Sequence, residues 1–295
     1  MSRGSRDDDR AKASDRAPDR EVRDRPRTRP DEVAARGVML PRGQEREVIA
    51  FRGREYSLNG SQTRALATVG AFRVVAIDDL HSDDRGPHLR DSDWRSLSAQ
   101  GLVTHDTLTD RHGIHHVVAL TRAGKDLLDG HAADRSGDRQ QTYYAEVVKP
   151  RELGHDSRLY AAFQKEAERI EDQGGRVTRI VLDYELKSDY QKFLNRKDRP
   201  TDANLDGDRQ TFADEHDLTV VRGHLELPDV RIEYETEAGR LEYRDVELVT
   251  EHYSRGQLGG KSKAGFACYR AGGSVGAAGG RTGETPFDPR NLERL

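Results

Sequence analysis

The chain has 295 residues, of which 34% are hydrophobic and 35% are charged. Because globular proteins are typically about 45–50% apolar, this composition excludes one packed core along the whole chain and predicts sizeable disordered parts. The net charge of −4 excludes a globally basic protein, so any contact with nucleic acid has to come from local patches. The single cysteine, Cys268, excludes a disulfide framework and a cysteine-rich zinc site. The sequence has neither an apolar run of about 20 residues nor an N-terminal hydrophobic signal, so we expect a soluble cytoplasmic protein without membrane contact.

Residues 1–45 are rich in arginine, aspartate and proline and contain few side chains suited to a core. This composition predicts a disordered tail. Both signs of charge are mixed along it, so the tail differs from the purely basic arms that bind nucleic acids. A short β element is expected over residues 47–58, at the start of a first folded unit that spans residues 46–131.

This first unit shows a helical pattern followed by a β-hairpin pattern. Ser61 is a candidate N-cap, and Trp94 and Leu97 recur at the spacing of one helix face. The expected elements, in chain order, are a helix over 61–72, a short helix over 75–80, a helix over 90–100, strands over 102–109 and 114–120, and a helix from Thr121.

The run LSAQGLV at 97–103, followed by VVALTRAGKDLL at 117–128, resembles the bacterial MarR-like winged helix-turn-helix pattern. In that pattern a recognition helix ends in a Gly-Leu-Val step and the wing leads into Leu-Thr-x-x-Gly. The resemblance implies that helix 90–100 enters the major groove of DNA, while the wing touches the backbone or the minor groove.

The candidate DNA-binding residues are Arg90, Arg95 and Ser96 on this helix and Arg111 and His112 at the wing tip. Arginine can pair with guanine edges, and residues at the wing tip can contact phosphate. The helix also carries Asp91 and Asp93, whose charges oppose DNA. The alternative is a winged helix that makes protein contacts.

The second half of the chain begins after a polar linker over residues 132–142, and a glycine-rich flexible tail is expected over 272–295. Between them, residues 143–271 show helical and strand patterns, with a charged insertion over 188–217. The expected core elements are a helix over 156–173, strands over 176–186, 229–236 and 241–249, a helix over 251–264 and a strand over 266–270.

The predicted hairpin brings two carboxylates together. A two-residue turn at Ala238-Gly239 places Asp229 opposite Leu248, and a slip of one residue places it opposite Glu247. Either register makes Asp229 and Glu247 near neighbours, within roughly 4.5–8 Å between their Cβ atoms. Two such carboxylates need a positive charge between them. Mg²⁺, which proteins usually hold through one or two carboxylates, is one candidate.

Leu-Pro-Asp at 227–229, Glu247 and the following lysines resemble the PD-(D/E)XK nuclease-like superfamily. The resemblance implies that Asp229 and Glu247 hold the metal and that Lys261 or Lys263 acts as the catalytic lysine. This chain departs from the family pattern, because Val249 stands where the pattern has lysine. Variants with the lysine on the following helix exist.

Glu166 and Glu185 are two further acidic residues to consider for this site. The resemblance also implies that a glutamate of the first helix, here Glu166, joins the site, and the alternative is a surface carboxylate. Glu185-Leu186-Lys187 repeats the acid-x-Lys spacing but lacks a preceding Pro-Asp strand. For Asp229 and Glu247 themselves, the alternative is a solvated strand edge in a binding domain.

A winged helix joined to a nuclease-like domain resembles the plasmid replication-relaxation proteins of bacterial mobile elements. The shared features are Leu-Thr-x-x-Gly at 120–124, His155-Asp156, Leu-Pro-Asp at 227–229, Glu247, and Lys263 with Tyr269. The fold implied is α/β multidomain, with an N-terminal winged helix-turn-helix, an αβββαβ restriction-endonuclease-like domain and disordered termini.

Three functions are compatible with the sequence. The first is a DNA-binding accessory or regulatory protein of plasmid replication or transfer, whose nuclease-like domain is degenerate and which has protein partners in a replication or transfer complex. The second is an active Mg²⁺-dependent endonuclease that uses Asp229, Glu247 and Lys261 or Lys263. The third is a protein-binding adaptor. Val249 favours the first function over the second.

Overall fold

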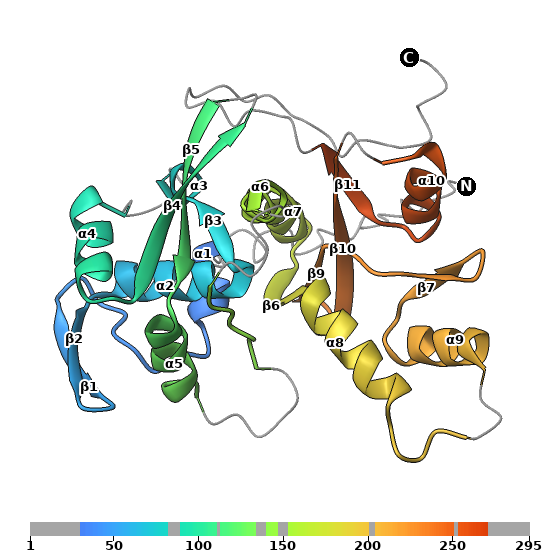
Figure 1. Cartoon of the computed structure of the whole chain (residues 1–295), viewed down its shortest axis with the longest axis horizontal. Helices are drawn as coiled ribbons and strands as arrows, with labels where there is room; N and C mark the ends of the chain where they lie inside the picture. Colours follow the sequence, from blue (N-terminus) through green and yellow to red (C-terminus); the bar gives the residue numbers. More distant parts are fainter. Residues whose placement is uncertain are drawn as a thin grey trace, which may run out of the picture.

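The computed structural model is a mixed α/β structure with several small sheets (Figure 1). It describes residues 30–81, 89–110, 113–133, 140–146, 153–200, 204–250 and 253–270. The elements up to α5 lie on the left of Figure 1, the later sheet and helices lie on the right, and helix α7 lies between them.

The left-hand half consists of helices, a three-stranded sheet and a separate hairpin. The three-stranded sheet has the order β3-β5-β4, with antiparallel pairs. The elements of this left-hand half are β1 (Glu47–Phe51), β2 (Arg54–Leu58), α2 (Gly60–Phe72), β3 (Val74–Ala76), α3 (Ile77–His81), α4 (Asp91–Ala99), β4 (Val103–Asp110), β5 (Gly113–Leu120) and α5 (Arg122–Gly130). The predicted hairpin and the helices over 61–72 and 90–100 are confirmed, whereas the segment predicted as a helix over 75–80 starts as strand β3.

Helix α2 begins with a capping box. The side chain of Asn59 accepts a hydrogen bond from the Gln62 N–H, and the Gln62 side chain accepts one from the Asn59 N–H. These bonds satisfy backbone donors that the first turn of a helix leaves unpaired. The prediction of Ser61 as N-cap was therefore wrong by two residues, because Asn59 offers the oxygen acceptor earlier in the chain.

The right-hand half contains a four-stranded sheet with the order β11-β10-β9-β6, in which only the β10–β11 pair is parallel. Helix α7 packs on this sheet, and its buried side chains include Phe163 and Ile170. The elements are α6 (Leu153–Asp156), α7 (Leu159–Asp172), β6 (Arg176–Leu182), α8 (Asp183–Leu194), α9 (Leu205–Glu215), β7 (Thr219–Val221), β8 (His224–Glu226), β9 (Val230–Glu235), β10 (Leu241–Val249), α10 (Arg255–Lys263) and β11 (Ala267–Arg270).

The strand predicted over 176–186 was wrong beyond Leu182, because the chain turns into helix α8 there. Asp183 and Glu185 lie in the first turn of α8, where negative charge is favourable at the positive end of the helix dipole. Leu186 is buried on the inner face of α8. The Glu185-Leu186-Lys187 motif is consequently helical and does not lie on a strand.

The β9–β10 hairpin has a three-residue loop. The Thr236 N–H donates to the Arg240 carbonyl at 2.8 Å, and Gly239 takes a φ of 74°, a left-handed conformation that suits glycine. Val246 pairs with Val230, so the next step of the antiparallel register sets Glu247 opposite Asp229. This is the second of the two predicted registers.

Residues 30–45 have a defined structure, which corrects the prediction of a disordered tail for this part, while residues 1–29 of the predicted tail lie outside the described residues. Helix α1 (Pro30–Ala35) buries Val33 and Ala34. The Tyr143 hydroxyl donates to the Ala34 carbonyl at 2.6 Å, and Arg36 donates to the Val177 carbonyl of β6 at 2.8 Å. Small apolar residues within a charged composition therefore suffice to pack this helix between the two halves.

One hydrophobic cluster runs through both halves. At its centre Phe72 of α2 contacts two rings of α7, with ring centroids 5.2 Å from Tyr160 and 5.1 Å from Phe163. The ends of the predicted linker are also packed, since the Gln141 side chain hydrogen-bonds both the N–H and the carbonyl of Ile180 on β6. Among the helices that the structure describes, none has the length and apolarity needed to cross a membrane.

The shared cluster predicts that the halves unfold together. Phe163→Ala removes a fully buried ring in the right-hand half and is expected to lower the free energy of unfolding by about 3–5 kcal/mol. Trp94, the single tryptophan, lies in the left-hand half and reports this loss by fluorescence in a urea titration. The control is Phe212→Ala, an equally buried ring in a separate cluster, which is expected to shift the Trp94 transition less. A Trp94 transition that Phe163→Ala leaves in place would contradict a shared core.

Candidate functional site

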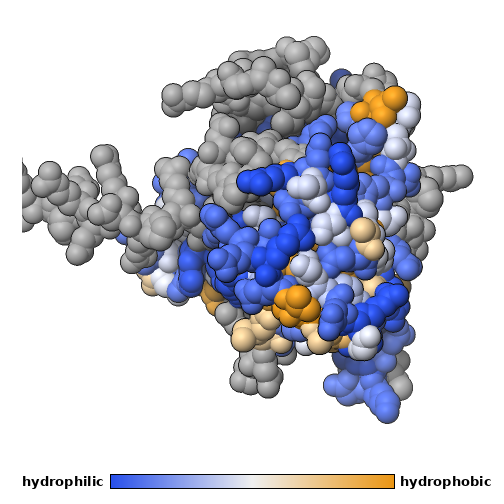
Figure 2. Space-filling view, turned by 90° about the vertical axis from the view of Figure 1, so that its left-hand side faces the viewer, coloured by the Kyte–Doolittle hydropathy of each residue, from blue (hydrophilic) through white to orange (hydrophobic). Residues whose placement is uncertain are grey.

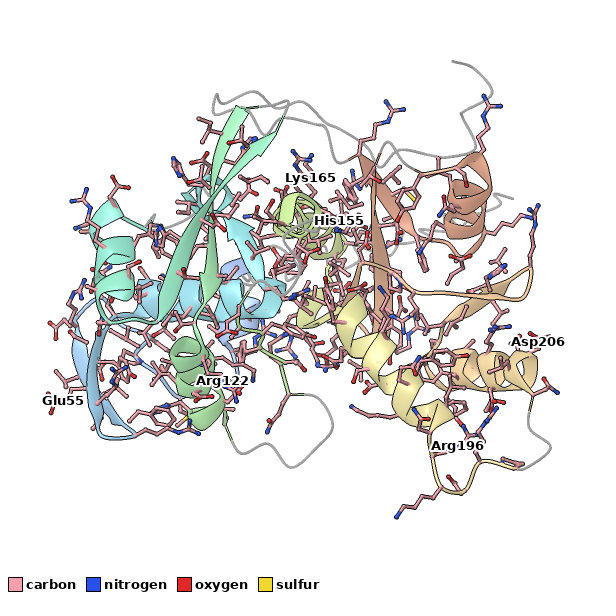
Figure 3. All side chains as sticks on the ribbon, viewed as in Figure 1. Glu55, Arg122, His155, Lys165, Arg196 and Asp206 are labelled. Carbon is pink, nitrogen blue, oxygen red and sulfur yellow. The ribbon has the colours of Figure 1, made fainter. Side chains whose placement is uncertain are left out.

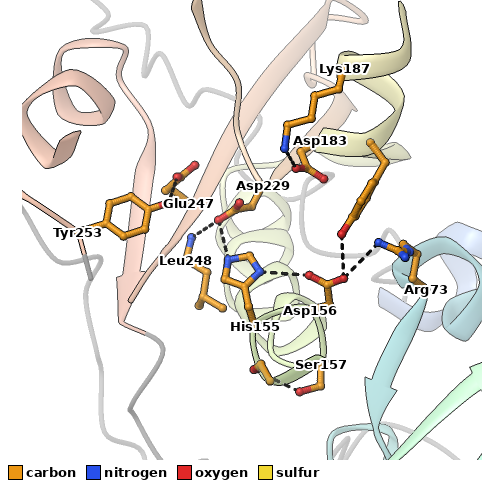
Figure 4. Close-up of polar contacts among 12 residues, drawn as sticks. Arg73, His155, Asp156, Ser157, Asp183, Lys187, Asp229, Glu247, Leu248 and Tyr253 are labelled. Carbon is orange, nitrogen blue, oxygen red and sulfur yellow. Dashed lines mark hydrogen bonds and ion pairs between the residues drawn. The ribbon is translucent and has the colours of Figure 1, made fainter. Parts of the chain in front are cut away.

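Asp229 directly precedes β9, and Glu247 lies in the second half of β10, so the hairpin register brings them together (Figure 4). One carboxylate oxygen of Asp229, Oδ2, accepts a hydrogen bond from the Leu248 N–H at 2.7 Å and lies 3.2 Å from Nε2 of His155. The Asp229 side chain therefore ties β10 to the start of α6–α7, in addition to being half of the carboxylate pair.

Glu247 is almost completely buried, with 1% of its surface exposed. Its Oε1 accepts a hydrogen bond from the Tyr253 hydroxyl at 2.5 Å and lies 3.1 Å from Nζ of Lys261. Its Oε2 is buried and has no hydrogen-bond partner in the described part of the chain. Burial and the nearby Asp229 charge raise the pKa of Glu247 to about 7, against the opposing effects of Lys261 and Tyr253.

Lys261 is the lysine that reaches the pair. Its ammonium group also donates to the Leu227 carbonyl at 2.7 Å and lies 3.6 Å from the carboxylate of Glu226. Lys263 is exposed on the same helix, α10. The structure thus brings Asp229, Glu247 and Lys261 together and leaves Lys263 at the surface.

His155 supplies the second positive charge. It is half-buried between the two halves (Figure 3), with Nδ1 3.2 Å from Asp156 and Nε2 3.2 Å from Asp229. Burial alone would lower the pKa of His155, but its hydrogen bonds and charge interactions with Asp156 and Asp229 outweigh burial and raise the pKa to about 10. At neutral pH His155 is accordingly an imidazolium that bridges two carboxylates.

Asp156 extends this network into the left-hand half. Its Oδ2 accepts a hydrogen bond from the Tyr184 hydroxyl at 3.2 Å and from Nη1 of Arg73 at 3.4 Å. The Arg73 guanidinium also stacks on the Tyr184 ring, 3.9 Å from its centroid. Since Arg73 directly follows α2, a chain of charged contacts joins that helix to Asp229.

A divalent cation fits these residues poorly. His155 and Lys261 already neutralise oxygens of both carboxylates, and Glu247 is closed to solvent. Within the described residues, no group of three or more histidine, cysteine, aspartate or glutamate side chains is arranged to hold a metal ion. Mg²⁺ requires open positions for water and substrate phosphate. We therefore derive no metal-dependent step for this site.

Glu166, predicted to join the site, belongs to another network. It is buried on α7, accepts a hydrogen bond from the Tyr269 hydroxyl at 2.6 Å and pairs with Arg169 and Arg244 at 3.2 Å each. Arg244 and Glu247 are three residues apart on β10, so their side chains point to opposite faces of the sheet. Glu166 therefore fixes α7 to β10 and β11 and is neither a surface carboxylate nor a partner of Glu247.

The candidate DNA-binding residues of α4 are only partly exposed. Arg90 and Arg95 are exposed, while Ser96 is half-buried and accepts a hydrogen bond from Arg46 at 3.0 Å. Asp93 is buried: it accepts a hydrogen bond from the Arg90 N–H at 3.2 Å and pairs with Arg46 at 3.3 Å. Arg111 and His112 lie outside the described residues.

Burial of Asp93 changes the charge of the α4 surface. Of the two aspartates expected to oppose DNA, only Asp91 is exposed, beside Arg90 and Arg95. The face of the molecule that carries the left-hand elements of Figure 1 is mostly hydrophilic, with scattered apolar residues (Figure 2).

The sequence motifs did not identify several residues that build these sites. The motifs mark His155-Asp156 only as a feature shared with the replication-relaxation proteins at the start of a helix, and no motif includes Arg46, Arg73, Tyr184 or Tyr253. A basic residue far from the carboxylates in sequence gives no local signal.

Comparison with protein-family models, with curated proteins and with solved structures finds no match, so the resemblances rest on motifs and on the order of elements.

The His155 bridge predicts a pH-dependent contribution to stability. A histidine whose pKa rises on folding stabilises the fold below its unfolded pKa of about 6.5, and this contribution is lost as the pH rises toward 10. His155→Gln is therefore expected to lower the free energy of unfolding at pH 6 by about 3 kcal/mol, because it removes the imidazolium charge between the buried Asp156 and the half-buried Asp229. Urea titrations between pH 6 and 9.5 measure the difference.

The control is Gln141→Ala, which removes a neutral side chain that hydrogen-bonds both the N–H and the carbonyl of Ile180. Gln141 has no titrating group, so the gap in unfolding free energy between wild type and Gln141→Ala is expected to stay constant, whereas the gap for His155→Gln is expected to narrow as the pH rises. A His155→Gln gap that stays constant or widens would rule out the imidazolium bridge.

Proposed function

We propose that this protein binds double-stranded DNA through helix α4, as an accessory or regulatory protein of a bacterial mobile element. The order α2-β3-α3-α4-β4-β5-α5 supports a winged helix-turn-helix. The observation that carries the proposal is the α4 surface, where Arg90 and Arg95 face solvent while Asp93 is turned inward and paired. Guanidinium groups at such positions bind phosphates and guanine edges.

For the right-hand half we propose a degenerate nuclease-like domain. The order α7-β6-β9-β10-α10-β11, interrupted by α8, α9 and the β7–β8 hairpin, supports the αβββαβ core. His155 and Lys261 neutralise Asp229 and Glu247 without a metal, which supports loss of catalysis. This domain then serves for contacts with other proteins of a replication or transfer complex.

The second candidate function is an active Mg²⁺-dependent endonuclease. One observation favours it: Lys261 approaches Glu247 at 3.1 Å, so an Asp-Glu-Lys set is assembled although Val249 occupies the usual lysine position. The burial of Glu247, and the contacts of Lys261 with Glu247 and of His155 with Asp229, favour the DNA-binding function instead. Neither observation favours the protein-binding adaptor.

The DNA-binding proposal predicts that Arg95→Ala weakens binding to a duplex by about 1–3 kcal/mol, since an exposed arginine on the recognition helix contacts bases or phosphates. Fluorescence anisotropy with a labelled duplex, at several salt concentrations, measures the change. The control is Arg240→Ala, an arginine with 77% of its side chain exposed in the β9–β10 loop. Binding that Arg95→Ala and Arg240→Ala reduce equally, or that neither reduces, would contradict an interface on α4.

A further inference from the structure

Arg46 lies against helix α4 although it belongs to a different part of the sequence. It directly precedes β1, and its guanidinium donates from Nη1 to the Ser96 hydroxyl at 3.0 Å and pairs through Nη2 with Asp93 at 3.3 Å. Asp93 and Ser96 are three residues apart, so they lie along one side of α4. About 41% of the Arg46 side chain is exposed. The group is therefore held on the helix and still open to solvent.

The β1–β2 hairpin fixes this position. Its strands pair from Glu47 with Leu58 to Phe51 with Arg54. The side chain of Gln100, at the end of α4, accepts a hydrogen bond from the Ser57 N–H at 2.6 Å and donates one to the Ser57 carbonyl at 3.2 Å. These two bonds tie β2 to α4. Arg46 therefore needs little additional ordering when it binds a partner, and pre-organisation of this kind favours binding.

Arg46 also changes the charge that α4 presents. It neutralises Asp93, which would otherwise repel a polyanion, and adds a third solvent-exposed guanidinium to those of Arg90 and Arg95 at this helix. A guanidinium group has five N–H donors. The contacts to Ser96 and Asp93 use one donor each from Nη1 and Nη2, and the remaining N–H groups can donate to an anionic oxygen.

We propose that Arg46 is a phosphate-binding residue of the DNA interface, positioned by the β1–β2 hairpin at the edge of the groove that α4 occupies. This inference rests on the proposed DNA-binding function. It extends the interface from α4 and the β4–β5 hairpin to a third element, and the contact is one to the DNA backbone, independent of base sequence.

The test measures how DNA affinity depends on salt. The full chain is titrated onto a labelled 24-base-pair duplex of mixed sequence by fluorescence anisotropy at several KCl concentrations. Each phosphate contact adds about 0.9 to the slope of log affinity against log salt concentration. Arg46→Ala is expected to weaken binding and to lower this slope by about 0.9. Arg46→Lys, which keeps the charge, should retain the wild-type slope.

A second variant separates contact with phosphate from neutralisation of Asp93. If Arg46 only shields Asp93, the double variant Arg46→Ala/Asp93→Asn recovers the wild-type slope. Asparagine keeps an oxygen that can accept from the Arg90 N–H, so the start of α4 is preserved. The proposal predicts that the slope of the double variant stays low. The control is Arg176→Ala, which removes a half-exposed, ion-paired arginine of β6.

The outcomes distinguish this inference from the function on which it rests. If the wild type binds in a salt-dependent way and Arg46→Ala leaves the slope unchanged, the Arg46 contact is overturned and the DNA-binding proposal stands. The same holds if the double variant Arg46→Ala/Asp93→Asn recovers the wild-type slope. A wild type that fails to bind the duplex at low salt overturns both. A slope that is lowered in Arg46→Ala and in the double variant and retained in Arg46→Lys and Arg176→Ala, with an unchanged thermal midpoint, supports the contact.

Discussion

The structure depends on how it compensates two neighbouring carboxylates, the buried Glu247 and the half-buried Asp229. The register of the β9–β10 hairpin sets Glu247 opposite Asp229, and charges so close together in a poorly solvated position repel each other. Basic side chains of the same chain neutralise them. Lys261 from α10 pairs with Glu247, and His155 from α6 pairs with Asp229. These two contacts connect the central strands of the sheet, β9 and β10, to helices α6 and α10.

The same compensation joins the two halves of the molecule. His155 bridges Asp229 to Asp156, and Asp156 is held by Arg73 at the end of α2. Beside this polar connection, the aromatic contacts of Phe72 with α7 bury the apolar surface between the halves. The surface of α4 uses charge similarly, since Arg46 takes Asp93 out of the exposed face. In each case a basic side chain of the protein neutralises an acidic side chain.

Part of this arrangement was predictable from the sequence, because it depends on local patterns. The alternation around Gly239 located the hairpin and made Asp229 and Glu247 neighbours, and the spacing of Trp94 and Leu97 located α4. The positions of His155, Arg73 and Arg46 depend on tertiary packing between distant segments, for which one sequence gives no signal. Helix α1 was missed because its few apolar residues stand in a highly charged segment. Glu166 was misplaced because helical spacing gives the face of α7 but not the side of the sheet on which that face packs.

We propose that this protein binds DNA and that its carboxylate pair is held by protein cations in place of a metal. The most direct test incubates the protein with supercoiled plasmid in Mg²⁺ or Mn²⁺, with Glu247→Ala beside the wild type, and resolves the products on one gel. Retarded, uncut plasmid is expected for both proteins. Cleavage by the wild type that disappears in Glu247→Ala would contradict it and identify Asp229, Glu247 and Lys261 as an active nuclease site.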